Sequence, residues 1–253
     1  MIALKNFYYK CLDILTLKKG VPKKINNHVV RFPARWSRYY ESNYEEANYR
    51  FLQQQVKPGM QLIDIGAHIS LFSATASQLT GPGGKIICFE PTPGTYTVLK
   101  ETLRLNKCDN VIPVQAAVSD KEGEAVFYVS DTEACNSNSL VKNKEENEIT
   151  GYPVKLVTID NVVSAYALKP SIIKIDAEGA ELDVLKGRIP TYKSLKPVLI
   201  LGLHPAFIKQ KGDSMEAIWD LLEENKYEVK LDGKVLTKSQ FCRHTLLFDV
   251  HCF

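Results

Sequence analysis

"LIDIGAHIS", residues 62–70, is an apolar run that enters a glycine turn and continues into small residues. This pattern predicts a buried strand over 61–65 and a helix over 69–79, joined by a tight turn at Gly66. Strand–turn–helix units of this kind hold nucleotide-like cofactors in α/β proteins. A dinucleotide loop needs three glycines and a phosphate loop needs a lysine, and this turn has neither. The turn therefore favours a cofactor without phosphates.

Strands and helices alternate along the chain from this turn. Further strands are predicted at 85–90, 111–119, 124–130, 153–159, 171–176, 197–203, 227–231 and 244–250. Helices are predicted at 92–106, from 180 onward and at 213–225. The alternation indicates an α/β fold, a mostly parallel, doubly wound sheet with helices on both faces. The last two strands flank the turn "DGK" (232–234) without room for a crossover helix, which predicts an antiparallel edge hairpin.

Composition and length favour a globular protein built around one large domain. The 253 residues are 45% hydrophobic and 24% charged, with a net charge of +3, which argues against disorder and against a nucleic-acid partner. There is no zinc-type cysteine spacing, secretory leader or twenty-residue apolar run, so we expect a cytoplasmic protein without a structural metal or integral membrane segment. Pro58-Gly59 divides a helical and aromatic segment (1–57) from the main domain (58–253).

The first twenty residues place apolar side chains at helical spacing among lysines. Such a basic amphipathic helix either touches a membrane surface or packs on its own domain, and the sequence leaves both possibilities open.

Polar residues follow four of the predicted strands, where ligands bind in open α/β sheets. Asp64 closes the first strand, Glu90 the second and Asp176 a later one, while His204 follows the most apolar strand. Each alone has a structural explanation, such as a turn cap, an ion pair or a core histidine. Together they predict a ligand site, because unpaired buried carboxylates are costly.

A phosphate-free cofactor with a cationic amino acid end suits these carboxylates, and S-adenosylmethionine is such a cofactor. Asp64 would attract the cationic end. Glu90 would bind both ribose hydroxyls, since the ribose acid usually lies about 20 residues beyond the glycine loop.

Five stretches in this order resemble the FkbM family of S-adenosylmethionine-dependent methyltransferases, over roughly residues 44–250. They are "LIDIGAHIS", "GKIICFEPTPGTYTVL", "PVKLVTID", "IIKIDAEGAELDVLKG" and "LILGLHP". The "KIDAEGAELDVLKG" stretch is the most specific. His68 and Ser70 depart from the usual asparagine and glycine of the first loop. The resemblance implies a seven-stranded, Rossmann-like class I methyltransferase fold and methyl transfer, typically to a hydroxyl of a sugar, a glycan or a similar polar metabolite.

The resemblance also implies a set of cofactor contacts. The methionine part would lie against the first loop, the ribose against Glu90 and the adenine near Ala117 and Ser119. The full set of cofactor residues expected on this basis is Glu45, Asp64, Gly66, Ala67, His68, Glu90, Pro91, Ala117, Ser119 and Asp176.

Methyl transfer to a hydroxyl needs an acceptor held in line and a base near its proton. The candidate catalytic residues are Asp176, His204, Glu178 and Lys174. If "KIDAE" stays extended, Lys174, Asp176 and Glu178 share one face. Glu178 could instead tie the strand end to the next helix. Two carboxylates and a histidine could hold a divalent cation, which remains an open alternative.

The acceptor pocket is expected between an aromatic stretch and the polar loop 131–150. The stretch contains Trp36, Tyr39, Tyr40 and Tyr44, whose rings could stack on sugars or simply pack the segment down. Three rival functions stay open: a methyltransferase acting on RNA or protein, a degenerate methyltransferase fold kept as a binding module, and an NAD-dependent oxidoreductase. The missing glycines of a dinucleotide loop disfavour the third.

Overall fold

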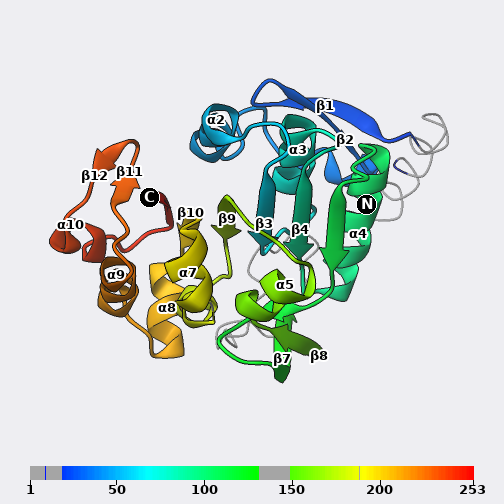
Figure 1. Cartoon of the computed structure of the whole chain (residues 1–253). Coiled ribbons are helices and arrows are strands. Elements are labelled where there is room, and N and C mark those ends of the chain that lie inside the picture. Colours follow the sequence, from blue (N-terminus) through cyan, green and yellow to red (C-terminus); the bar gives the residue numbers. More distant parts are fainter. Residues whose placement is uncertain (1–8, 10–18, 131–148, 188) are drawn as a thin grey trace.

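The computed structural model describes residues 9, 19–130, 149–187 and 189–253, and its central feature is a large sheet flanked by helices (Figure 1). Across the sheet the order is β12 (Lys234–Val235), β11 (Val229–Leu231), β13 (Phe248–Cys252), β10 (Val198–Leu203), β9 (Ile172–Ile175), β3 (Gln61–Ile65), β4 (Lys85–Phe89) and β5 (Val111–Val114). The helices are α2 (Glu46–Gln55), α3 (Leu71–Thr80), α4 (Pro93–Leu105), α5 (Ile159–Ala165), α6 (Glu181–Lys186), α7 (Ile189–Leu195), α8 (Pro205–Lys211), α9 (Met215–Glu224) and α10 (Lys238–Cys242). The predicted α/β class is confirmed.

The central strands β5, β4, β3, β9 and β10 are parallel. From β3 the chain proceeds outward to β4 and β5 on one side, and it later returns to β9 and β10 on the other. The strand order therefore reverses between β3 and β9, the place where ligands bind in such sheets. Glu90, Asp176 and His204 follow β4, β9 and β10 directly, so they meet at this carboxyl edge, as predicted.

The antiparallel strand pair predicted near the end of the chain is present, but its connection differs from the prediction. β13 pairs antiparallel with both β10 and β11. The turn at Asp232 and Gly233 joins β11 to the two-residue strand β12 instead. Helix α10 then begins at a capping box, in which Thr237 and Gln240 each accept a hydrogen bond from the other's backbone N–H. This box explains why a helix, and not a direct hairpin, precedes the last strand.

The segment 111–119, predicted as one strand, forms two. β5 ends at Val114, and β6 (Ala117–Val118) joins β8 (Ile149–Val157) and β7 (Gly123–Ser130) in a separate three-stranded sheet. Pro113 lies on edge strand β5, where a missing N–H is tolerated. A tight turn follows, in which the Ala116 N–H donates to the Val114 carbonyl over 3.2 Å. Ala117 is thereby moved off the main sheet and beside β8.

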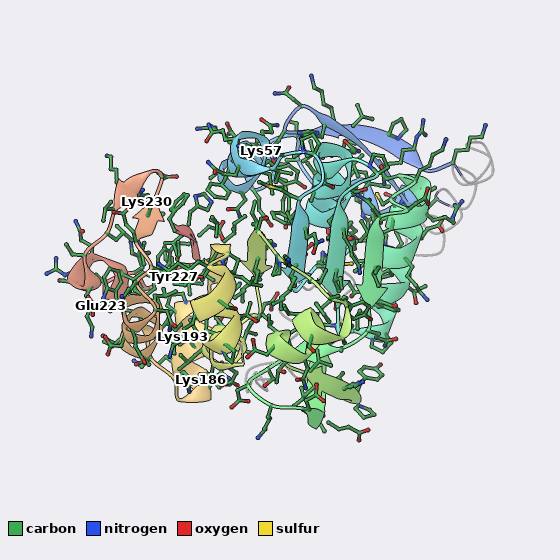
Figure 2. The ribbon with its side chains drawn as sticks, viewed as in Figure 1. Lys57, Lys186, Lys193, Glu223, Tyr227 and Lys230 are labelled. Carbon is green, nitrogen blue, oxygen red and sulfur yellow. The ribbon has the colours of Figure 1, made fainter. Side chains whose placement is uncertain are left out.

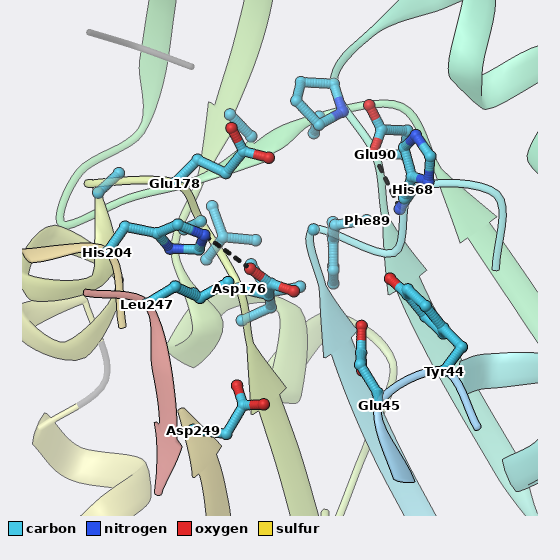
Figure 3. A pocket seen from close by; sticks show the side chains of 18 residues that line it. Tyr44, Glu45, His68, Phe89, Glu90, Asp176, Glu178, His204, Leu247 and Asp249 are labelled. Carbon is cyan, nitrogen blue, oxygen red and sulfur yellow. Dashed lines mark hydrogen bonds and ion pairs between the residues drawn. The ribbon is translucent and has the colours of Figure 1, made fainter. Parts of the chain in front are cut away.

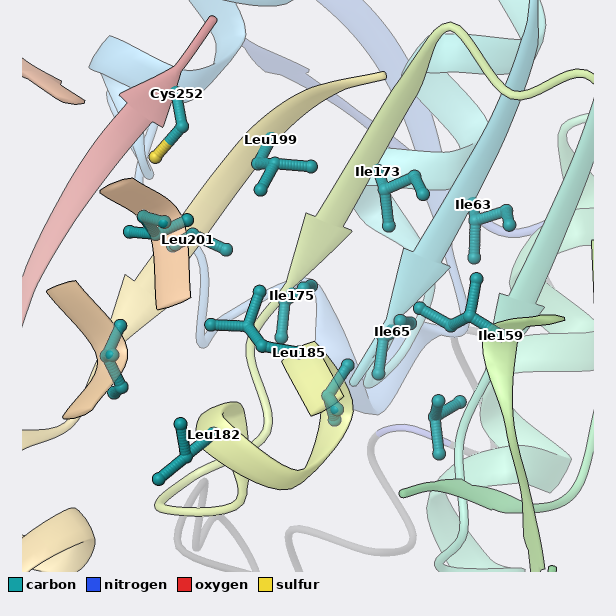
Figure 4. Close-up of a cluster of buried hydrophobic side chains, with 14 of the residues drawn as sticks. Ile63, Ile65, Ile159, Ile173, Ile175, Leu182, Leu185, Leu199, Leu201 and Cys252 are labelled. Carbon is teal, nitrogen blue, oxygen red and sulfur yellow. The ribbon is translucent and has the colours of Figure 1, made fainter. Parts of the chain in front are cut away.

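Alternation along the central strands sorts their side chains onto two faces. On one face, the core includes Ile63, Ile65, Ile173, Ile175, Leu199 and Leu201, packed against α5, α6, α8, α9 and α10 (Figure 4). On the other, it includes Leu62, Ile86, Ile172 and Ile200, packed against α2, α3 and α4. Asp64 and Lys174 belong to this second face, where they are 0% and 5% exposed. Two charged groups thus enter an otherwise apolar layer just below the carboxyl edge.

A hairpin that was not predicted precedes the large sheet. β1 (Val21–Ile25) and β2 (His28–Phe32) are joined by Asn26 and Asn27, whose φ angles are 43° and 71°. Such two-residue turns favour asparagine. The pair "NN" between two segments of alternating apolar and polar residues could therefore have predicted this hairpin. With the 3-10 helix η1 (Ala34–Trp36) and α2, this hairpin joins the core beside α3 and α4. The division of the chain at residue 58 stays a prediction.

The helix expected over residues 1–20 lies almost entirely outside the described residues. Of the loop expected over 131–150, residues 131–148 also lie outside them, and residues 149–150 begin strand β8. In the described ranges, no helix combines the length and apolarity needed to cross a membrane. Side chains fill the space between the sheet and its helices, and charged groups such as Lys186 and Glu223 are exposed at the surface (Figure 2).

Candidate active site

A cavity of about 200 Å³ opens at the carboxyl edge, over the point where the strand order reverses (Figure 3). Nine residues predicted from the sequence line it: Glu45, Gly66, His68, Glu90, Pro91, Ala117, Asp176, Glu178 and His204. His204 and Asp176 lie on one side of the cavity, and Glu90 with His68 on the other. The structure therefore brings most of the predicted site residues together.

Four predicted residues do not line this cavity. Ala67 and Lys174 line a smaller hollow of about 30 Å³ behind the loop after β3. Asp64 is wholly buried and accepts a hydrogen bond of 2.6 Å from the Ser73 hydroxyl. Ser119 is buried, and its backbone N–H donates to the Val157 carbonyl over 2.9 Å.

The loop after β3 is held in an unusual backbone conformation. Gly66, His68 and Ser70 have φ angles of 75°, 48° and 70°, in the left-handed region. At Gly66 only glycine fits, since an added Cβ would lie 1.8 Å from the Asp176 carbonyl oxygen. Histidine, like the asparagine usual at position 68 in the family that the sequence resembles, is one of the residues enriched in this region. Glycine, which is usual at position 70, adopts the region more readily than serine. The departure at Ser70 therefore carries backbone strain.

Replacing Ser70 with glycine is expected to stabilise the fold by about 0.5–1 kcal/mol, because the relieved left-handed strain exceeds the added unfolded-state entropy. The Ser70 side chain contributes only a weak contact of 3.9 Å to the Cys88 sulfur. Denaturant unfolding would measure the change. Ala74→Gly, in the regular part of α3, is the matched control and should lose about 1 kcal/mol. If both variants were destabilised equally, the backbone at Ser70 would not be strained.

Glu90 is a buried carboxylate at the cavity wall. One of its oxygens accepts from the His68 N–H over 3.1 Å, and the other from the Thr92 N–H over 2.9 Å. Burial raises the pKa of Glu90 to about 7, although these hydrogen bonds oppose the shift. The Thr92 side chain also hydrogen-bonds to Glu90. A carboxylate has about four acceptor positions, so Glu90 can still accept a hydrogen bond from a ligand hydroxyl.

His68 is held as a neutral imidazole. Burial lowers its pKa to about 4. Its Nδ1 and the Tyr40 hydroxyl are hydrogen-bonded over 2.8 Å, and Trp36 packs edge-on against its ring. Two members of the predicted aromatic stretch thus fix the loop, and a third, Tyr44, lines the cavity.

Lys174 is the centre of a buried charge cluster. Its Nζ lies 3.0 Å from Asp176 Oδ2 and 3.8 Å from Glu45 Oε2, and β9 places it beside Asp64 of β3. Burial opposes its charge, but the surrounding carboxylates outweigh burial and raise the pKa of Lys174 well above its usual value. Burial alone would raise the pKa of Asp176, but the positive charges of Lys174 and His204 hold it below its usual value. The cluster is an ion-pair network in which Asp176 stays ionised.

Glu178 does not continue the face that Lys174 and Asp176 share, contrary to the prediction. β9 ends at Ile175, and Glu178 has a φ of 46°, so the alternation of an extended strand stops before it. Glu178 reaches the cavity from the turn that follows β9.

Asp249 is a site residue that sequence reasoning missed. The sheet register aligns Asp249 of β13 with Gly202 of β10. A Cβ at Gly202 would lie 3.1 Å from Asp249 Oδ1 and 3.2 Å from Asp176 Oδ1, so this glycine makes room for both carboxylates. Burial raises the pKa of Asp249 to about 6, and Asn48 donates to it over 3.1 Å. A lone aspartate in the last strand of the chain gives no sequence signal of such a role.

Glu181 is the second site residue that was missed. It is 0% exposed and accepts from the Gly179 N–H, while His204 Nδ1 lies 2.9 Å from its Oε1. His204 Nε2 lies 3.7 Å from Asp176 Oδ1. Burial opposes the charged imidazole, but the hydrogen bond to Glu181 and the nearby carboxylates raise the pKa of His204 above its usual value. His204 is therefore held between two acids.

Among the described residues, no group of three or more histidine, cysteine or acidic side chains has the arrangement of a metal site.

Residues 64–229 match the model of the methyltransferase FkbM domain. The hexuronic acid methyltransferase AglP of Haloferax volcanii is 27% identical over 199 residues, which cover 74% of this chain and 78% of that protein. Methyltransferase sdnD of Sordaria araneosa is 28% identical over 209 residues, which cover 71% of this chain and 78% of that protein.

The crystal structure of methyltransferase FkbM from Methylobacillus flagellatus KT has the same fold, with a TM-score of 0.51 and 14% sequence identity. The match covers 83% of this chain but 52% of that one, so this chain spans about half of its length. The fold is thus the Rossmann-like methyltransferase fold, as predicted. Since the family model spans well over half of the sequence, the chain belongs to the methyltransferase FkbM family and is an S-adenosylmethionine-dependent methyltransferase.

Proposed function

We propose that this protein transfers the methyl group of S-adenosylmethionine to a hydroxyl of a sugar, a glycan or a similar polar metabolite. The observation that carries the proposal is the cavity itself, which has the glycine turn and Glu90 on one side and Asp176 with His204 on the other. The similarity to a hexuronic acid methyltransferase supports an acceptor of the sugar class.

The residues of the carboxyl edge fit this cofactor. The bare backbone at Gly66 leaves space for the methionine part. Glu90 retains acceptor capacity for the ribose, and Ala117 leaves an apolar wall for the adenine. When bound, the cofactor supplies a methyl group already activated by a sulfonium. The acidic cavity favours that positive charge.

Binding of S-adenosylmethionine is expected to weaken about tenfold between pH 8 and pH 6, because Glu90 must be ionised to accept from the ribose. The raised pKa of Glu90, about 7, falls inside this window, and protonation on acidification removes the acceptor. Equilibrium dialysis with labelled cofactor would measure the affinity. The Glu90→Gln variant should bind weakly with a much flatter pH profile. An unchanged pH dependence in Glu90→Gln would assign the effect to another group.

The acceptor hydroxyl would lose its proton to the opposite wall. Asp176 and His204 face the cavity there, and Lys174 holds the Asp176 carboxylate in place over 3.0 Å. A positioned base of this kind contributes about 10²–10⁴-fold to the rate. If Asp176→Asn and His204→Ala both bound the cofactor and retained near wild-type turnover, this assignment of proton removal would be wrong.

The test is a transfer assay with cofactor labelled in its methyl group, run with and without Mg²⁺. Neutral hexosides, hexuronates and short glycans would be offered as acceptors, and RNA and protein would be offered in parallel as the rival classes. Label recovered as a methyl ether of a sugar supports the proposal. Label on RNA or protein, with the sugars unmodified, overturns it.

A further inference from the structure

Glu181 is wholly buried, yet it makes contact with the cavity wall through His204. Both of its oxygens accept from the Gly179 N–H, at 3.1 and 3.0 Å, and Oε1 also lies 2.9 Å from His204 Nδ1. Among the residues that the structure describes, His204 is the only basic side chain within 4.0 Å of Glu181. A buried carboxylate is costly unless a partner stabilises its charge. An uncharged side chain could form a merely structural hydrogen bond to His204, so an acid at this position points to a further role.

The hydrogen bond determines which nitrogen of His204 carries its proton. Because the Glu181 oxygens act as acceptors, Nδ1 is the donor, and the neutral imidazole then has its lone pair on Nε2. Nε2 is the nitrogen near Asp176, on the wall of the cavity (Figure 3). The Phe207 ring lies nearly parallel to the imidazole, with centroids 6.1 Å apart and an interplanar angle of 21°.

We infer that Glu181 is the positioning residue of this site: it fixes His204 in the Nδ1–H form and aims Nε2 at the acceptor hydroxyl. The inference rests on the proposed function and deepens it, since it distinguishes His204 from Asp176 as the proton acceptor. The same arrangement of a buried acid, a histidine and a hydroxyl operates in hydrolytic triads.

The acceptor oxygen gives its proton to His204 Nε2 while it forms a bond to the methyl carbon. The carbon–sulfur bond breaks, and its electron pair stays on sulfur. The imidazolium that results lies between Glu181 and Asp176, with Asp249 and Glu178 as the other charged groups facing it. These carboxylates stabilise its positive charge until the proton leaves to solvent.

The test is nitrogen-15 NMR of the histidine rings in the full-length protein, which needs no acceptor. The chain has five histidines, and a His204→Gln variant would assign the signal of His204. At a pH above its titration, His204 of the wild type should be in the Nδ1–H form. This differs from the Nε2–H form that predominates in unconstrained histidine. An Nε2–H form in the wild type overturns the inference even if no variant folds.

The variant Glu181→Gln keeps the shape of the side chain and removes its charge. It should lower the pKa of His204 below the wild-type value and mix the two ring forms, while the affinity for S-adenosylmethionine changes less than about threefold. The matched control is Asp183→Asn, which removes an acid of the same helix that pairs with Lys211 of α8 over 2.8 Å. An unchanged His204 titration in Glu181→Gln, or an equal change in both variants, overturns the inference.

With an acceptor in hand, Glu181→Gln should lower kcat about 10²-fold with little change in the KM for the cofactor. The NMR experiment tests the role of Glu181 and the transfer assay tests the proposed acceptor, so either hypothesis can be rejected without the other. A wrong ring form rejects the role of Glu181 whatever the acceptor is, whereas an Nδ1–H form without sugar methylation rejects only the proposed acceptor.

Discussion

Replacing Gly66 with alanine is expected to lower the free energy of unfolding by more than about 3 kcal/mol and to abolish cofactor binding. Two effects add at this position. The φ of 75° costs an alanine about 1–2 kcal/mol. Its Cβ would also lie 1.8 Å from the Asp176 carbonyl oxygen, which is backbone and cannot rotate away. The strand ends of β3 and β9 would have to separate, and the cavity lies between them and β4.

Gly59→Ala is the matched control for this experiment. Its φ is 83°, but an added Cβ meets nothing within 4 Å. It should therefore show the backbone cost alone, about 1–2 kcal/mol, with cofactor binding intact. Denaturant unfolding and calorimetric titration would measure both properties. If Gly66→Ala behaved like Gly59→Ala in both assays, the close approach of the loop to β9 would not be essential.

Replacing Lys174 with methionine is expected to cost about 3–5 kcal/mol at pH 8, because removal of one partner leaves buried carboxylates without their cation. Asp176 lies 3.0 Å from the ammonium, and Asp64 and Glu45 also raise the pKa of Lys174. Methionine keeps most of the volume beside Phe72, so lost packing is a small part of the change.

The loss should shrink as the pH falls. In the wild type, Lys174 holds the pKa of Asp176 below its usual value, so the pair stabilises the fold above that range. Without the ammonium, burial raises the pKa of Asp176, and the carboxylate takes up a proton on acidification. Unfolding measured at pH 8 and pH 5 would detect this difference. A Lys174→Met, Asp176→Asn double variant should recover most of the stability, and failure to recover it would contradict the coupling.

The strand ends could be predicted because their signal is local. Apolar runs mark β3, β4, β9 and β10, and the residue that ends each run must lie at the carboxyl edge of a parallel sheet. Glu90, Asp176 and His204 therefore came together as expected.

The missed residues depend on information that no local pattern holds. Asp249 reaches the cavity only because β13 inserts antiparallel beside β10, in a register that pairs it with Gly202. Glu181 looks like an ordinary acid in the first turn of a helix, and its contact with His204 joins residues 23 positions apart. Glu178 was expected to share a face with Asp176 because the point at which a strand stops is not visible in "KIDAE".

We propose that the carboxyl edge binds S-adenosylmethionine between the Gly66 turn and Glu90. Calorimetric titration of the wild type and of Glu90→Ala with this cofactor at pH 8 tests it most directly. We predict one binding site in the wild type and an affinity at least about 10²-fold lower in Glu90→Ala, since hydrogen bonding to a charged acceptor is lost. No binding by the folded wild type, or equal binding by the variant, would contradict the account.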